Sequence, residues 1–121
     1  MKRLLLFALV LSWCSLALPA EESLSAREAA KHVGEHATVC GLVASTHFAT
    51  RSKGQPTFLN LDEPYPKAVF TVLIWGDDRP RFGEPEVRFR DKRICTTGEI
   101  KLYQGVAEIV AREPAQIRME K

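Results

Sequence analysis

Two aromatic side chains, Phe58 and Trp75, are the residues whose chemistry is best suited to holding a ligand. Both stand in short apolar segments, and aromatic rings of this kind stack on nucleic-acid bases or on sugars. If both segments are strands, alternation places the polar side chains of Asn60 and Thr71 on the same outer face as the rings. Neighbouring segments add positive charge and a phenol at the rim of this face: Arg51, Lys53, Lys67, Lys101 and Tyr103. Together these residues form the predicted ligand-binding face.

Other interpretations of this face remain open. Phe58 or Trp75 could belong to the core, or a helix could cover the outer face. A register error of one residue would reverse the assignment, because strand side chains alternate between the two faces of a sheet. The charged rim residues could equally be ordinary solvated loop residues.

Catalytic and metal-binding chemistry has weaker candidates. His32 and His36 have i, i+4 spacing, but Gly34 interrupts the helix that would present them on one face, and His47 stands apart from them. Ser45 with His47 and a distant aspartate could be drawn as a triad, yet no nucleophile elbow surrounds this serine. We therefore expect a protein that is not an enzyme and that has no cofactor and no metal.

A dense mixture of charges occupies residues 77–93. The basic residues are Arg79, Arg81, Arg88, Arg90, Lys92 and Arg93, and the acidic residues are Asp77, Asp78, Glu84, Glu86 and Asp91. Because the two signs nearly balance, this segment is predicted to be a solvated, salt-bridged connection rather than a basic patch. One helical turn is expected around 86–89.

The N-terminal residues 1–20 have the composition of a secretory signal peptide. Lys2 and Arg3 form a basic start, and an apolar run over 4–18 leads to small residues ending at Ala20. This run is short for a membrane span, which needs roughly 20 apolar residues. We expect cleavage after Ala20 and export of the chain to the periplasm or the medium.

This segment also has alternatives to cleavage after Ala20. Ala17 is the second candidate for cleavage, and a retained membrane anchor is the alternative to cleavage. Lipidation of Cys14 would require a small residue before it, but Trp13 stands there. The predicted mature domain is therefore 21–121, without a membrane span.

Processing also changes the net charge. The full chain has 17 Lys+Arg and 15 Asp+Glu, so removal of Lys2 and Arg3 leaves 15 against 15. A neutral protein must attract a polyanion through local patches, because its overall charge contributes nothing.

The mature sequence has the pattern of one short helix followed by five strands. Ser25 and Glu28 form a capping box before the helix, and Gly34 can end it. The predicted strands are 38–44, 57–61, 70–75, 93–100 and 106–110. Gly41 is a candidate bend in the first of them. This order predicts an all-β fold, a five-stranded Greek-key barrel of the OB type with a short N-terminal helix, and a β-sandwich is the alternative.

Two cysteines remain in the mature chain, Cys40 and Cys95. Two cysteines in an exported domain are typical of one disulfide, and they lack the paired spacing of a metal site. In an OB barrel the first and fourth strands are neighbours, which would place Cys40 near Cys95.

Several stretches of the sequence are informative beyond the periodic spacing of their apolar residues. They are 31–34, 39–43, 55–61, 70–79, 97–105 and 107–110, within roughly 30–117. In these stretches the chain resembles small secreted bacterial OB-fold domains of the nucleic-acid-binding type. The resemblance is more specific for the fold than for a ligand, because OB barrels bind nucleic acids, sugars and proteins alike.

The resemblance implies an exported OB module that binds single-stranded nucleic acid with little sequence preference. The alternative is a module of the cell envelope that binds a protein or a small ligand, which the neutral mature charge favours. The architecture also resembles the staphylococcal nuclease barrel, an enzyme class that needs clustered carboxylates and two arginines. The residue types are present at Asp62, Glu63, Asp77, Asp78, Arg79 and Arg81. No motif of that class matches, so nuclease activity is not expected.

Overall fold

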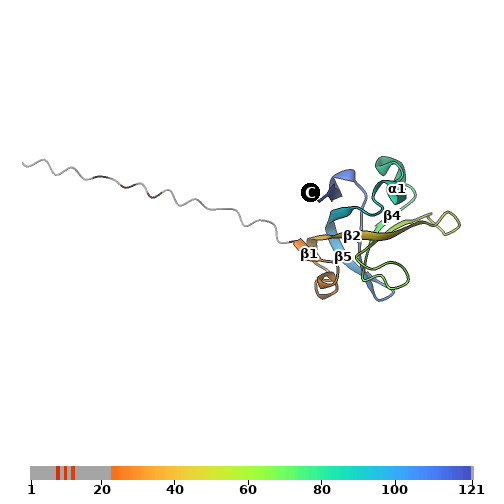
Figure 1. Ribbon diagram of the computed structural model, residues 1–121, viewed down its shortest axis with the longest axis horizontal. Coiled ribbons are helices and arrows are strands. Elements are labelled where there is room, and N and C mark those ends of the chain that lie inside the picture. The colour runs from red at the N-terminus through yellow and green to blue at the C-terminus, as the bar shows by residue number, and fades with distance from the viewer. Residues whose placement is uncertain (1–7, 9, 11, 13–22, 121) are drawn as a thin grey trace, which may run out of the picture.

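A computed structural model describes residues 8, 10, 12 and 23–120. The predicted signal peptide therefore lies almost wholly outside the described residues. The strands are β1 (Ser23–Ser25), β2 (His36–Phe48), β3 (Thr57–Leu61), β4 (Phe70–Ile74), β5 (Arg93–Tyr103), β6 (Val106–Val110) and β7 (Ile117–Met119). The helical segments are the 3₁₀ helices η1 (Glu28–Lys31), η2 (Arg79–Phe82) and η3 (Pro114–Gln116), and the single turn α1 (Pro85–Arg88). Figure 1 shows these elements gathered into one body of strands.

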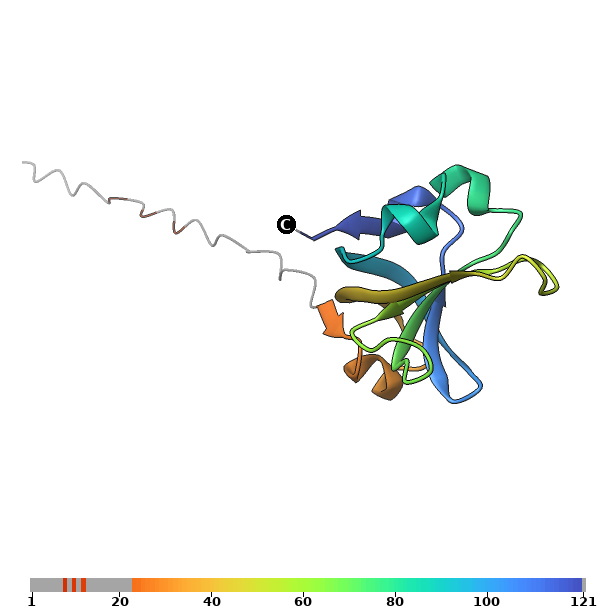
Figure 2. The same ribbon diagram turned by 45° about the vertical axis from the view of Figure 1, so that its right-hand side comes forward.

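Five of the strands close into a ring. The long strand β2 pairs with β5 along its first half and with β3 along its second half. The ring continues from β3 to β4, from β4 to β6 through a parallel pairing, and from β6 back to β5. Every strand of the ring thus has two hydrogen-bonded neighbours within the ring, and Figure 2 shows the loop between β2 and β3 projecting away from these strands.

The strand count was underestimated from the sequence. Seven strands form the sheet, because β1 adds to β2 in parallel and β7 adds to β5 in antiparallel orientation. Both are three-residue strands, too short to show a period-2 pattern. The first predicted strand was also too short, since β2 extends over His36–Phe48, and its irregularity lies between Val43 and Ser45 rather than at Gly41.

The predicted N-terminal helix is a 3₁₀ turn, η1. The backbone N–H of Glu28 donates to Ser25 Oγ at 3.2 Å, one of the two contacts of the predicted capping box, but the helix begins later than predicted, with Arg27 and not Ser25 at its N-cap. The helix cannot continue, because the N–H of Gly34 donates to the carbonyl of Ile100 and the N–H of Ile100 donates to the carbonyl of Glu35. These two bonds attach the chain to β5 and force it into an extended conformation.

The interior of the ring holds the side chains that alternation assigned to it. In β3 the inward residues are Leu59 and Leu61, and in β4 they are Phe70, Val72 and Ile74, all fully buried. Burying such a side chain contributes about 1.5–3 kcal/mol. The connection after β4 closes one end of the core with Phe82 and Phe89.

The connection between β4 and β5 is the salt-bridged segment that the sequence predicted. Arg79 pairs with Glu86, and its guanidinium lies 3.9 Å from the centroid of the Phe48 ring. Arg81 pairs with Glu113 at 2.7 Å. The predicted helical turn is α1, one residue earlier than expected.

The predicted disulfide is confirmed. Cys40 and Cys95 are direct register partners on β2 and β5, and their sulfur atoms are bonded at 2.03 Å. Within the part of the chain that the structure describes, no helix combines the length and the apolar character needed to cross a bilayer.

Candidate ligand-binding groove

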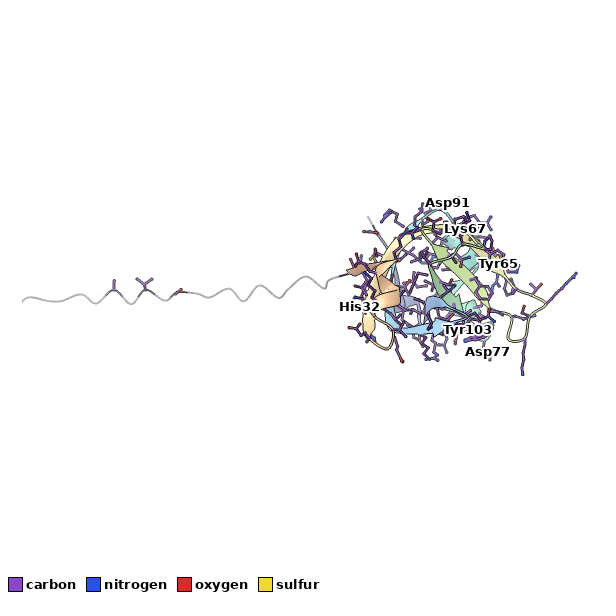
Figure 3. All side chains as sticks on the ribbon, turned by 90° about the horizontal axis from the view of Figure 1, so that it is seen from below. His32, Tyr65, Lys67, Asp77, Asp91 and Tyr103 are labelled. Atoms are coloured by element: carbon purple, nitrogen blue, oxygen red, sulfur yellow. A yellow bond between two sulfur atoms is a disulfide. The ribbon has the colours of Figure 1, made fainter. Side chains whose placement is uncertain are left out.

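A cavity of about 680 Å³ opens on the outer face of β2, β3, β4 and β6. Its lining comes from these strands, from the loop after β3 and from the β5–β6 turn. The residues are Ser45, Thr46, His47, Ala49, Ser52, Phe58, Asn60, Tyr65, Pro66, Ala68, Thr71, Tyr103, Gln104, Val106 and Glu108. Tyr65 and Tyr103, both labelled in Figure 3, are exposed members of this lining. We call this cavity the groove.

A row of polar side chains crosses the floor of the groove from strand to strand. The register pairs Ser45 with Asn60, Asn60 with Thr71, and Thr71 with Glu108. It then pairs Glu108 with Lys101 on β5. One polar position from each strand of the ring therefore lies on the same line, which we call the polar row.

Hydrogen bonds lock the β2, β3 and β4 members of the polar row. Thr71 Oγ1 donates to Asn60 Oδ1 at 2.8 Å, and Asn60 Nδ2 donates to Ser45 Oγ at 3.0 Å. The backbone N–H of Tyr65 also donates to Ser45 Oγ at 3.0 Å, which attaches the loop after β3 to the row. Asn60 and Thr71 lie on the outer face as predicted and line the groove, but they are only 5% and 7% exposed.

Glu108, the β6 member of the row, has no such partner. Its carboxylate makes no hydrogen bond and no ion pair with any of the residues described, and only 8% of the residue is exposed. Burial raises the pKa of Glu108 above its usual range, and the nearby positive charge of Lys101 lowers it in part. A carboxylate that lines a cavity and has no donor of its own is suited to a ligand that donates hydrogen bonds.

Aromatic rings lie beside the polar row. The His47 and Phe58 rings stack with centroids 6.5 Å apart and planes 6° apart. A second cavity of about 210 Å³ continues from the groove and is lined by Lys53, Leu73 and Trp75, among others. The lining residues common to both cavities are Ser52, Phe58, Tyr103 and Glu108.

The position of Trp75 depends on the turn between β2 and β3. A Cβ added at Gly54 would lie 3.0 Å from Trp75 Cε3, so only glycine lets the turn pack closely on the indole. The N–H of Gly76 donates to the carbonyl of Gly54 at 2.9 Å, which holds the two segments together. Trp75 remains 40% exposed and presents the rest of its ring to the second cavity.

The structure brings together most of the predicted binding face. Six of the predicted residues line one or both cavities: Phe58, Asn60, Thr71, Trp75, Lys53 and Tyr103. Three exposed cations line neither cavity: Arg51 in the β2–β3 turn, Lys67 in the loop after β3, and Lys101 on β5. The predicted basic rim is therefore a set of separate charges around the groove.

Ion pairing differs between the cations around the groove and those of the connection between β4 and β5. Among residues 23–120, no ion pair involves Arg51, Lys53, Lys67 or Lys101. The connection instead uses Arg79 and Arg81 in ion pairs with acidic neighbours. Arg88, Arg90 and Lys92 of the connection likewise form no ion pair among the described residues, so cations without ion pairs stand both beside the groove and in the charge-dense segment.

The sequence prediction missed Glu108, Ser45 and Tyr65 as parts of the groove. A signal for Glu108 was present, because Ala107 and Ile109 alternate inward in β6 and leave Glu108 on the outer face. No local signal placed Tyr65 there, since it lies in the loop between β3 and β4.

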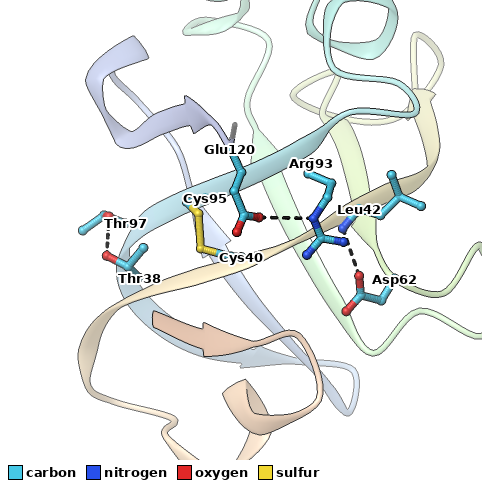
Figure 4. The surroundings of a disulfide bond; sticks show 8 residues. All are labelled: Thr38, Cys40, Leu42, Asp62, Arg93, Cys95, Thr97 and Glu120. Atoms are coloured by element: carbon cyan, nitrogen blue, oxygen red, sulfur yellow. Dashed lines mark hydrogen bonds and ion pairs between the residues drawn. A yellow bond between two sulfur atoms is a disulfide. The ribbon is translucent and has the colours of Figure 1, made fainter. Parts of the chain in front are cut away.

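The described residues hold one cluster with the side-chain types of a metal site, formed by Cys40, Cys95 and Glu120. The two sulfur atoms are joined in the disulfide, and Glu120 pairs with Arg93 at 3.3 Å (Figure 4). Both interactions occupy the atoms that a metal would need. His32 pairs with Glu35 at 2.6 Å.

Comparison with known proteins relates this chain to others by fold. No protein-family model matches it, and no curated protein matches it. OBody AM1L10, in a structure bound to hen egg-white lysozyme, is 18% identical with a TM-score of 0.56 over 85% of this chain and 96% of that one. OBody AM2EP06, also bound to hen egg-white lysozyme, is 14% identical with a TM-score of 0.56 over 84% and 94%.

A larger protein contains a similar domain. A chain assigned as an aspartyl-tRNA synthetase from Leishmania major Friedlin is 12% identical with a TM-score of 0.54 over 87% of this chain. Only 22% of the synthetase chain is matched, so the likeness concerns one part of that protein. Identities this low show the fold alone, which is all-β and similar to the OB fold.

Proposed function

We propose that this chain is an exported binding module of the OB type that holds single-stranded nucleic acid in the groove. The observation that carries the proposal is the pair of connected cavities with aromatic walls, beside which stand cations without ion pairs. Bases stack on aromatic side chains whatever their identity, and separate cations hold the backbone. Such a site binds with little sequence preference and does not require catalytic residues.

Export is the compartment that best suits the chain. The Cys40–Cys95 disulfide is of a kind that persists in oxidising compartments and is rare in the cytosol. The composition of residues 1–20 supports the same compartment, as a periplasmic or secreted protein.

The groove itself favours a second candidate, a module that binds a protein or a small ligand. No lysine or arginine lines the larger cavity, and its only charged carboxylate is Glu108. Exposed Tyr65 and Tyr103 are of the type enriched at protein interfaces. The OBody neighbours were solved bound to a protein, lysozyme.

Fluorescence anisotropy separates the two candidates. A labelled oligothymidine of about ten nucleotides is titrated with the mature protein across a range of salt concentrations. Four phosphate contacts, from Arg51, Lys53, Lys67 and Lys101, predict a slope of about −3 in log K against log salt. Affinity should then fall about fiftyfold between about 50 and 200 mM salt.

Substitutions locate the site. Trp75→Ala should weaken binding by about 1–3 kcal/mol, the contribution of one stacked base. Lys53→Gln should reduce the magnitude of the salt slope by about 0.7. The matched controls are Val87→Ala and Arg118→Gln, exposed residues that line neither cavity, and neither should change binding. No binding at low salt would reject the nucleic-acid proposal and favour the protein or small-ligand module.

A further inference from the structure

Glu108 lies on the floor of the groove, and its carboxylate has no hydrogen-bond partner among the described residues. The residue is only 8% exposed. It lies at the junction of the two cavities, because it lines both of them. A carboxylate in such a place is an acceptor with two oxygens and no donor of its own.

The polar row cannot satisfy this carboxylate from either side. On one side the hydroxyl proton of Thr71 is committed to Asn60 Oδ1. On the other side Lys101 is exposed and forms no ion pair with Glu108. Glu108 lines both cavities, so its carboxylate oxygens are available there to a ligand that donates hydrogen bonds.

The walls determine what kind of group can reach Glu108. Phe58 and Tyr103 line both cavities together with Glu108, so an aromatic ring bound against either wall lies beside the carboxylate. The edge of a planar base would then meet Glu108 while its face contacts an aromatic side chain. Bases of single strands are recognised in this way, by stacking and by hydrogen bonds to their free edges.

The four bases differ in what their Watson–Crick edges offer to two acceptor oxygens. Guanine presents two adjacent donors, N1–H and the N2 amino group. Adenine and cytosine present one amino group next to an acceptor nitrogen, and thymine presents one N–H between two carbonyl groups. A carboxylate pairs in bidentate fashion only with adjacent donors.

We propose that Glu108 recognises guanine, because its carboxylate accepts hydrogen bonds from N1–H and from the N2 amino group of one base in the groove. This inference rests on the proposed function, because it assigns a base preference to the same site. The rest of the bound strand is held by stacking and by the rim cations without preference. A good bidentate contact discriminates by about 1–3 kcal/mol, so we expect at least about fivefold tighter binding of guanine at this position.

The test uses three labelled strands of five nucleotides: pentathymidine, the same strand with a central guanine, and the same strand with a central inosine. Inosine lacks the N2 amino group and keeps N1–H, so it removes one donor alone. Each strand is titrated by anisotropy against the wild-type protein, Glu108→Gln and the control Glu99→Gln. Glu99 is an exposed acid on β5 that lines neither cavity.

The readout is the ratio of affinities between strands, because the loss of the negative charge of Glu108 itself raises the affinity for all strands together. We expect the order guanine, inosine, thymine in the wild type and in Glu99→Gln, and equal affinities for guanine and inosine in Glu108→Gln, because its amide has no second acceptor for the N2 amino group. Equal binding of the three strands by the wild type would overturn the inference and leave the proposed function intact. A preference for guanine over inosine that persists in Glu108→Gln would do the same. No binding of any strand would reject both.

Discussion

Removing the disulfide should lower the stability of this domain more than any other change between β2 and β5. The perturbation is the double substitution Cys40→Ala with Cys95→Ala, which keeps both Cβ atoms and removes the covalent bond. The two cysteines are 55 residues apart. In the chain-entropy model, a closed loop of that length stabilises the fold by about 4 kcal/mol.

This loss is large compared with the whole stability of a small domain, which is about 5–15 kcal/mol. For a chain of this size, about 4 kcal/mol corresponds to a decrease in Tm of about 15–30 °C. Urea unfolding followed by circular dichroism measures the free energy. The m-value should rise in the variant, because an unfolded chain without the cross-link exposes more surface.

A neighbouring residue pair provides the matched control. Thr38 and Thr97 join the same two strands two residues away, through a hydrogen bond of 2.6 Å between their hydroxyl groups. Replacing both by valine removes this bond without changing the chain connectivity, and should cost at most about 1 kcal/mol. If the cysteine variant loses no more stability than the threonine variant, the loop-closure argument is wrong.

Further predictions concern the core and the groove. Gly98→Ala should destabilise the fold by about 1–3 kcal/mol in urea unfolding, since its Cβ would lie 2.7 Å from Ile109 Cγ2; wild-type stability would contradict this packing. Phe70→Ala should cost about 3–5 kcal/mol, because a fully buried ring leaves a cavity. Burial raises the pKa of Glu108 and so makes its charged form unfavourable in the fold; the stability of the wild type relative to Glu108→Gln should therefore fall as the pH rises above the usual pKa of a glutamate. If the difference in stability between the wild type and Glu108→Gln does not change with pH, this prediction is wrong.

Much of the fold follows from local signals. The predicted strands 57–61 and 106–110 coincide with β3 and β6, because alternation and the flanking turns define their ends. The turn at Gln104 and Gly105 has positive φ at both positions, as a two-residue hairpin requires. The inward positions of β3 and β4 are likewise those that alternation assigns.

Other features of the fold depend on distant partners. β2 continues to Phe48 because its second half pairs with β3 after its first half has paired with β5. The helix after Ser25 stops after one turn because Ile100 bonds to the chain around Gly34. Such pairings join residues far apart in the sequence, and no window of neighbouring residues contains them.

The candidate site divides in the same way. The sequence by itself determined the outward face of β3 and β4, with Phe58, Asn60 and Thr71, since alternation within a strand is a property of the local backbone. Only the tertiary structure decided that Glu108 stands beside Thr71. The two residues meet through the parallel pairing of β4 with β6. Closing the ring brings those strands together, and whether a carboxylate there keeps a hydrogen-bond partner depends on every strand around it.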